Sequence, residues 1–187
     1  MKNKYVWKKV DDLPIIEELP DPFMKADGTR ITSPDEWDAQ REYLKDMLSH
    51  YMYGPILPNP ENTVGTVLES NVIYDGKALR EKVNIRCGPE HRISFDVYII
   101  RPNRAGRFPV ITWNCFKDMR PSPMEEEAVC HREYCIAMFE KEQLAIDKPV
   151  YKGGVYDVYP DYPWKAIAVW AWGHMRIVDF LESTSYA

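Results

Sequence analysis

Hydrophobic and polar residues alternate through the middle of the chain. Residues 83–87 alternate apolar with polar positions, and residues 93–99 do the same after the Gly-Pro turn at 88–91. Alternation on both sides of a turn predicts an antiparallel hairpin with one buried face. Residues 64–74, which end before an Asp-Gly pair, predict one strand before this hairpin.

The hydrophobic pattern then changes to compact apolar runs. Residues 109–113 and 134–139 are such runs, and between them Ser122-Pro123-Met124-Glu125 has the form of a capping box that opens a helix to about His131. Strand, helix and strand with runs buried on both faces predict a parallel βαβ unit. After a loop rich in Tyr and Pro, apolar residues at helical spacing predict a long helix over about 163–182.

The N-terminal part has a different pattern. Three prolines favour an extended arm over residues 1–32, and Ser33-Pro34-Asp35-Glu36 predicts a capped helix that Gly54-Pro55 ends. We therefore expect an α/β fold, an antiparallel hairpin followed by a parallel βαβ unit in an incomplete, open sheet. The expected parts are an arm with its capped helix, residues 1–62, and an α/β domain, residues 63–187.

Composition narrows the function classes. The 187 residues correspond to roughly one domain. The net charge of −5 disfavours a nucleic-acid partner, since binding to phosphates depends on clustered Lys and Arg. No uncharged run approaches the roughly 18 residues of a membrane span, so no membrane partner is expected. The charged start has no apolar stretch behind it, which predicts no signal peptide, a cytoplasmic location and four reduced cysteines.

The long C-terminal helix carries a motif that resembles a known family. Trp170-Ala171-Trp172-Gly173, followed by Arg176, Asp179 and Leu181-Glu182, is similar to the helix before the nucleophile in the glucuronoyl-esterase-like carbohydrate esterases. This group of α/β-hydrolases is also labelled acetyl-xylan-esterase-like. The segments 19–23, 27–31, 36–37 and 50–55 are similar to the family's lead-in. The resemblance covers nearly the whole chain and the N-terminal half of the family's catalytic domain.

The resemblance implies an ester hydrolase that acts on uronate or acylated sugars of plant cell walls through a Ser–His–acid triad. In the family the nucleophile lies in a Gly-x-Ser-Arg-x-Gly elbow after the next strand. None of the seven serines here has Gly two residues to either side, as such an elbow generally requires. We therefore expect no catalytic residue in this chain, no cofactor and no activity of the chain alone. The open sheet edge predicts self-association or a missing C-terminal half.

The loop after the strand at 109–113 borders the active site in the family. Asn114, Cys115 and Phe116 are therefore candidates for the active-site border. Asn114 matches the family in residue type, but the usual Gly is absent. A Cys115 thiolate could act as a nucleophile if a histidine or a helix N-terminus lowered its pKa. No histidine has a motif-defined spacing to Cys115, so a structural cysteine is favoured.

Three further groups of side chains have chemistry to consider. Aromatic residues of the loop and of the start of the long helix could stack on sugar rings: Tyr156, Tyr159 and Trp164. Cys130-His131 and Cys135 do not supply the four ligands of a structural zinc, so no metal site is predicted. Arg176 and Asp179, at i and i+3, are expected to form a structural ion pair.

Three functional hypotheses remain open. The favoured one is the N-terminal portion of a glucuronoyl or acetyl-xylan type ester hydrolase, whose full-length form takes a carbohydrate ester. The second is a non-catalytic protein that binds sugars or another subunit through the aromatic loop and the open sheet edge. The third is a hydrolase of rearranged fold that depends on Cys115.

Overall fold

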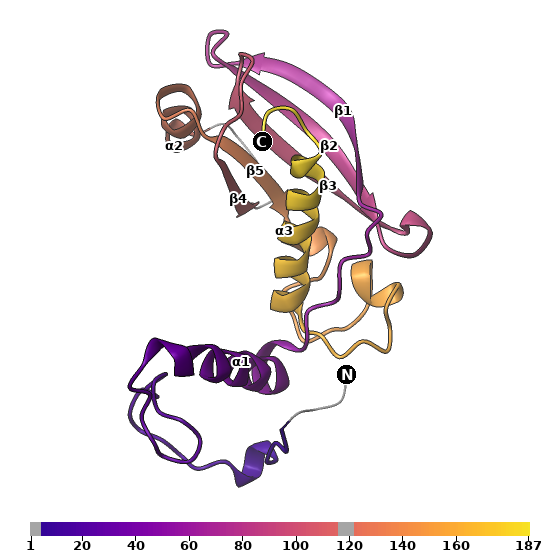
Figure 1. The fold of residues 1–187 in the computed structure, drawn as a ribbon. Coiled ribbons are helices and arrows are strands. Elements are labelled where there is room, and N and C mark those ends of the chain that lie inside the picture. Colours follow the sequence, from indigo (N-terminus) through magenta and orange to yellow (C-terminus); the bar gives the residue numbers. More distant parts are fainter. Residues whose placement is uncertain (1–4, 116–121) are drawn as a thin grey trace. The chain divides into compact units, whose positions relative to one another are not determined.

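The computed structural model describes residues 5–115 and 122–187 (Figure 1). The chain divides into two compact units, Met1–Pro55 and Ile56–Ala187, each of which is considered by itself below. The sequence-based boundary after residue 62 stays a prediction. Within the described residues no helix combines the length and the apolar character needed to span a lipid bilayer.

The first unit is built on helix α1, Trp37–Leu48, which a π-helical turn, Ser49–Tyr53, extends to Gly54. Gly54 adopts φ 74°, a left-handed conformation suited to glycine, and ends the helix as predicted. The capping box predicted at Ser33 is wrong. A 3-10 turn, Pro34–Glu36, precedes the helix, and the Glu36 carboxylate accepts from the backbone N–H of Thr32 at 3.0 Å. Ser33 makes no side-chain cap, because this tighter turn places Glu36 before the helix instead of in its first turn.

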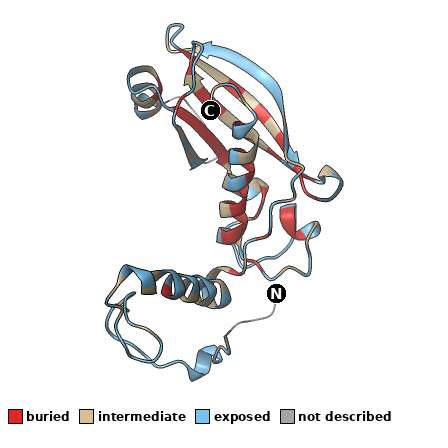
Figure 2. Cartoon of the chain, viewed as in Figure 1, coloured by how far each residue is buried: buried red, intermediate tan, exposed pale blue. Residues whose placement is uncertain are grey.

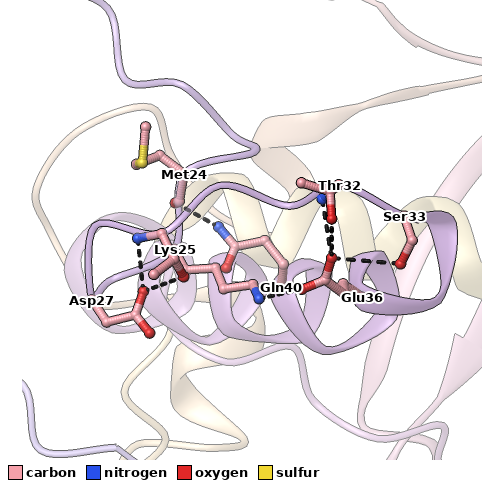
Figure 3. Close-up of polar contacts among 8 residues, drawn as sticks. Met24, Lys25, Asp27, Thr32, Ser33, Glu36 and Gln40 are labelled. Carbon is pink, nitrogen blue, oxygen red and sulfur yellow. Dashed lines mark hydrogen bonds and ion pairs between the residues drawn. The ribbon is translucent and has the colours of Figure 1, made fainter.

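A buried glutamine fastens the arm to this helix. Gln40 is 5% exposed and is the one fully buried side chain within residues 5–55. Its amide nitrogen donates to the carbonyl oxygens of Pro22 (3.1 Å) and Met24 (2.9 Å), and Lys25 pairs with Glu36 nearby (Figure 3). The arm is thus held to α1 by polar contacts together with aromatic contacts, among them that of Phe23 with Trp37, whose ring centroids lie 5.4 Å apart.

The second unit contains a five-stranded sheet in the order β1-β2-β3-β5-β4. All neighbouring strands are antiparallel except β4 and β5, which are parallel. The strands are β1, Val64–Ile73; β2, Ala78–Cys87; β3, Ile93–Pro102; β4, Val110–Cys115; and β5, Cys135–Glu140. The predicted hairpin and parallel unit are confirmed, and within the described residues β4 is an edge strand, as predicted.

Helices cover both faces of this sheet. Helix α3, Ala166–Glu182, lies across one face (Figure 1), where Gly173 packs against Phe139 of β5. On the other face Val129, in the π-helical turn that follows helix α2, Pro123–Glu126, packs in one cluster with Ile100 and Met138. Buried residues accordingly concentrate on β2, β3, β5 and the inner side of α3 (Figure 2).

Three elements differ from the predictions in type or in their ends. The capping box at Ser122 is present, but the helix it opens is α-helical only to Glu126 and continues as a π-helical turn to His131. Helix α3 begins at Ala166 and not at Pro163, because Lys165 is still extended (φ −110°, ψ 167°). Strand β4 runs on to Cys115, so Asn114 and Cys115 belong to the strand and not to the loop after it.

Candidate functional site

The carboxyl end of β4 brings one candidate residue into contact with a histidine of α3. The Nε2 of His174 lies 3.0 Å from the Oδ1 of Asn114. Because an amide oxygen only accepts, His174 donates through Nε2 and carries no proton on Nδ1 when neutral. Among the described residues that Nδ1 is buried without a hydrogen-bond partner. The bond leaves the amide nitrogen of the exposed Asn114 as the donor at this end of the strand.

Burial favours the neutral form of His174. Its ring meets Phe139 edge to face, with centroids 5.0 Å apart, and desolvation lowers its pKa below the usual 6.5. A proton added to Nδ1 would have to sit in a buried place without an acceptor. His174 is therefore suited to hold Asn114 in one orientation and poorly suited to shuttle protons.

Cys115 faces the opposite side of the sheet. Successive side chains of a strand alternate, so the side chain of Cys115 points away from the face where Asn114 meets His174. It packs instead against the cluster that contains Val129 and Met138. Burial, with a smaller effect of Glu140, raises the pKa of the Cys115 thiol to about 11. The structure thus does not bring Cys115 and His174 together as nucleophile and base. Phe116, the third border candidate, lies outside the described residues.

The aromatic candidates differ in how much ring they expose. Trp164 is 1% exposed and is enclosed edge to face by Tyr159, Tyr162 and Trp172, with centroids 5.4 to 6.1 Å apart. Tyr156 is 5% exposed, whereas Tyr159 is partly exposed. Tyr156 and Trp164 therefore act as packing residues here. The sugar-stacking role of all three stays a prediction.

The ion pair predicted on α3 is confirmed. The Nε of Arg176 donates to the Oδ2 of Asp179 at 2.6 Å, and the guanidinium lies 4.9 Å from the ring centroid of Trp172. Arg176 is 3% exposed, and Asp179 also accepts from the hydroxyl of Thr63 at 3.3 Å. The pair joins α3 to the segment that leads into β1, which is a structural role.

The cysteine-histidine group shows no metal geometry. Cys135 is buried within β5, and burial raises the pKa of its thiol to about 12. Across residues 5–115 and 122–187, no three His, Cys, Asp or Glu side chains are grouped to hold a metal ion.

Known proteins that resemble the chain are esterases. The 4-O-methyl-glucuronoyl methylesterase of Podospora anserina is 28% identical over 177 residues, which cover 91% of this chain and 33% of that protein. A multidomain esterase of Ruminococcus flavefaciens is 26% identical over 189 residues, 96% of this chain and 24% of that protein. No family model matches the chain.

Solved structures of glucuronoyl esterases have a fold similar to that of this chain. The glucuronoyl esterase from Solibacter usitatus superposes with a TM-score of 0.71 at 20% identity, over 95% of this chain and 56% of that one. A carbohydrate esterase family 15 glucuronoyl esterase from Caldicellulosiruptor kristjansonii gives a TM-score of 0.61 at 26% identity, over 92% of this chain and 46% of that one. The fold is that of an α/β-hydrolase-like carbohydrate esterase.

Within that class, the chain is related to the glucuronoyl esterases over the part that it spans. That part is about a third of the Podospora anserina enzyme and about half of the two solved structures. The resemblance inferred from the α3 motif is thereby confirmed.

Proposed function

We propose that this chain forms the first half of the catalytic domain of a carbohydrate esterase that cleaves glucuronoyl esters. The observation that carries the proposal is the match to proteins named 4-O-methyl-glucuronoyl methylesterase along 91% of the chain. The names of these relatives favour a glucuronoyl ester over an acetylated xylan as the substrate class. The open α/β sheet, with β4 at its edge, supports the same assignment.

The role proposed for this half is to supply scaffold and the border of the substrate site. Ligands of open α/β sheets bind beyond the carboxyl ends of the parallel strands, which is where β4 carries Asn114. Since His174 occupies the Asn114 oxygen, the amide nitrogen is oriented to donate a hydrogen bond to an ester or sugar oxygen. We propose Asn114 as a substrate-binding residue and His174 as the residue that positions it.

The chain alone is proposed to be inactive. A serine nucleophile at an elbow between strand and helix generally needs glycine close on both sides, and none of the seven serines has one at either second neighbour. Cys115 is no substitute, because its thiol stays protonated at neutral pH.

A hydrolysis assay tests this proposal. The purified chain is incubated with methyl 4-O-methyl-glucuronate and, separately, with an aryl acetate, beside a heat-denatured sample of the same chain. We expect equal rates in both samples for both esters. Faster hydrolysis of either ester by the folded chain, lost when the folded state is lost, would refute the proposed inactivity.

A further inference from the structure

Strand β1 forms the edge of the sheet opposite β4. Within the described chain it pairs with β2 alone, and it is exposed along most of its length (Figure 2). Its exposed apolar residues include Val67, at 51%, and Leu68, at 53%. Lysine and proline commonly protect an edge strand from association, and β1 contains neither. This edge is therefore apolar and open to a further strand.

The hydrogen bonds of the neighbouring strands show which residues of β1 face the open side. The N–H of Asn103 donates to the carbonyl oxygen of Lys77 at 2.8 Å, so Lys77 faces β3. Because backbone groups alternate along a strand, Val83 of β2 also faces β3. Val67 lies opposite Val83 and therefore turns its N–H and C=O groups to the open side, as does Gly65 two residues earlier.

The first half of β1 is bordered by an apolar ring and a cation. The ring of Phe180, on α3, lies so close to Gly65 that no Cβ would fit there. Arg86 of β2, which lies opposite Val64, is exposed and forms no ion pair within the described residues. A bulge after Val67 ends this regular stretch. We call Val64–Val67, Phe180 and Arg86 the β1 edge surface.

The first unit carries a segment with complementary properties. Two prolines enclose residues 15–19, which form no helix or strand and make no hydrogen bond within the described chain. Ile15 is 96% exposed and Leu19 is 95% exposed. Between them lie Glu17 and Glu18, and no lysine or arginine occurs within five positions on either side of the segment. The segment is thus apolar and acidic, whereas the β1 edge surface is apolar and basic.

Both ends of this segment are fastened within the first unit. Before it, the carbonyl oxygen of Lys8 accepts a hydrogen bond from the Tyr51 hydroxyl at 2.9 Å. After it, the carbonyl oxygen of Pro22 accepts from the Gln40 amide at 3.1 Å. A segment held at both ends loses less conformational freedom on binding than a loose tail does.

We propose that residues 15–19 of one copy of the chain add as a β-strand to the β1 edge surface of a second copy. The open backbone groups of Gly65 and Val67 bond the added strand, and the carboxylates of Glu17 and Glu18 lie near Arg86 of the other copy. Because each copy carries both surfaces, the exchange is reciprocal and closes a two-fold dimer. This inference does not depend on the proposed esterase function.

Sedimentation velocity over a concentration series tests the charge pairing. The parent chain is expected to form dimers. Glu17→Lys with Glu18→Lys should raise the dimer Kd by about tenfold or more, because attraction to Arg86 becomes repulsion. Adding Arg86→Glu to this variant should restore most of the loss. The control, Glu142→Lys with Asp161→Lys, reverses two exposed carboxylates elsewhere and should leave the Kd unchanged. A monomeric parent chain, an equal Kd in the two double variants, or no restoration by Arg86→Glu would overturn the proposal.

A mixed NMR sample identifies the occupant of the edge. Isotope-labelled parent chain is combined with unlabelled chain that carries a nitroxide at Ile16→Cys, and parent chain treated with the same reagent is the blank. We expect the amide signals of Gly65 and Val67 in the labelled copy to broaden. A nitroxide at Asp161→Cys should leave them sharp. If they broaden only when one copy carries both labels, the segment binds its own chain and the proposed second copy is wrong. Broadening at Thr112 of β4 instead would place the segment at the other edge and also contradict the proposal.

Discussion

Gly173 of α3 packs closely against Phe139 of β5, and a single methyl group at this position tests that packing. A Cβ at Gly173 would lie 2.5 Å from Cδ1 of Leu144 and 3.0 Å from Cζ of Phe139. Both neighbours are buried, at 1% and 0% exposed, so they have little room to move away. Gly173→Ala therefore sets a gain in helix propensity against an overpacked core.

The sizes of these two effects decide whether Gly173→Ala raises or lowers the free energy of unfolding. Replacing glycine by alanine inside a helix stabilises by about 1 kcal/mol. Inserting an extra methyl into a close-packed core costs about 1 to 3 kcal/mol. We expect Gly173→Ala to lower the free energy of unfolding by about 1 kcal/mol, measured by urea denaturation followed by tryptophan fluorescence. Ala171→Gly, on the outer side of the same helix, calibrates the propensity effect and should cost about 1 kcal/mol.

A second substitution separates packing from propensity. Leu144→Val shortens the side chain that the new methyl would strike, so part of the loss in Gly173→Ala should be recovered in the double variant, with a coupling energy of about 0.5 kcal/mol or more. If Gly173→Ala instead stabilises the chain by about 1 kcal/mol, the close packing of α3 on β5 is refuted.

Three further predictions concern titratable groups. Because the pKa of His174 is lowered in the folded state, its contribution to stability is complete above pH 6.5 and is lost as the pH falls through the folded-state pKa. His174→Phe should therefore reduce the drop in the urea midpoint between pH 7.5 and 5.5. An unchanged drop would refute the lowered pKa. Asp179→Ala leaves the buried Arg176 charge without its partner and should lower the free energy of unfolding by about 3 kcal/mol, measured by urea denaturation. A loss of less than about 1 kcal/mol would count against a buried ion pair. Burial raises the pKa of Cys87 to about 12 and that of Cys115 to about 11, so iodoacetamide at pH 8 should modify neither in the folded chain by mass spectrometry, whereas rapid modification of Cys115 would restore it as a candidate nucleophile.

The strands of the sheet could be predicted because burial leaves a strong periodic pattern. Residues 83–87 and 93–99 alternate in the sequence and pair in the structure as predicted. Capping motifs were less informative. The same Ser-Pro-x-Glu pattern forms a capping box at Ser122 but not at Ser33, where the chain first makes a 3-10 turn. Local sequence alone does not distinguish these two outcomes.

The candidate site was harder to predict because its contacts join distant parts of the chain. Asn114 could be proposed because the family resemblance implies an active-site border after the apolar run at 109–113, but His174 is 60 residues away and no motif spacing links the two. Trp164 shows the converse problem. Its residue type suits sugar stacking, but its burial depends on Tyr159 and Tyr162 of the loop and on Trp172 of α3, which come together only in the folded chain.

Labelling with a fluorophosphonate most directly tests the central claim that this polypeptide supplies esterase scaffold without an activated nucleophile. The reagent forms a stable adduct with a serine that a neighbouring base has activated, and intact-protein and peptide mass spectrometry locate the adduct. The account predicts unmodified peptides for all seven serines of the folded chain. A stoichiometric adduct on any one of them, absent after heat denaturation, would contradict it.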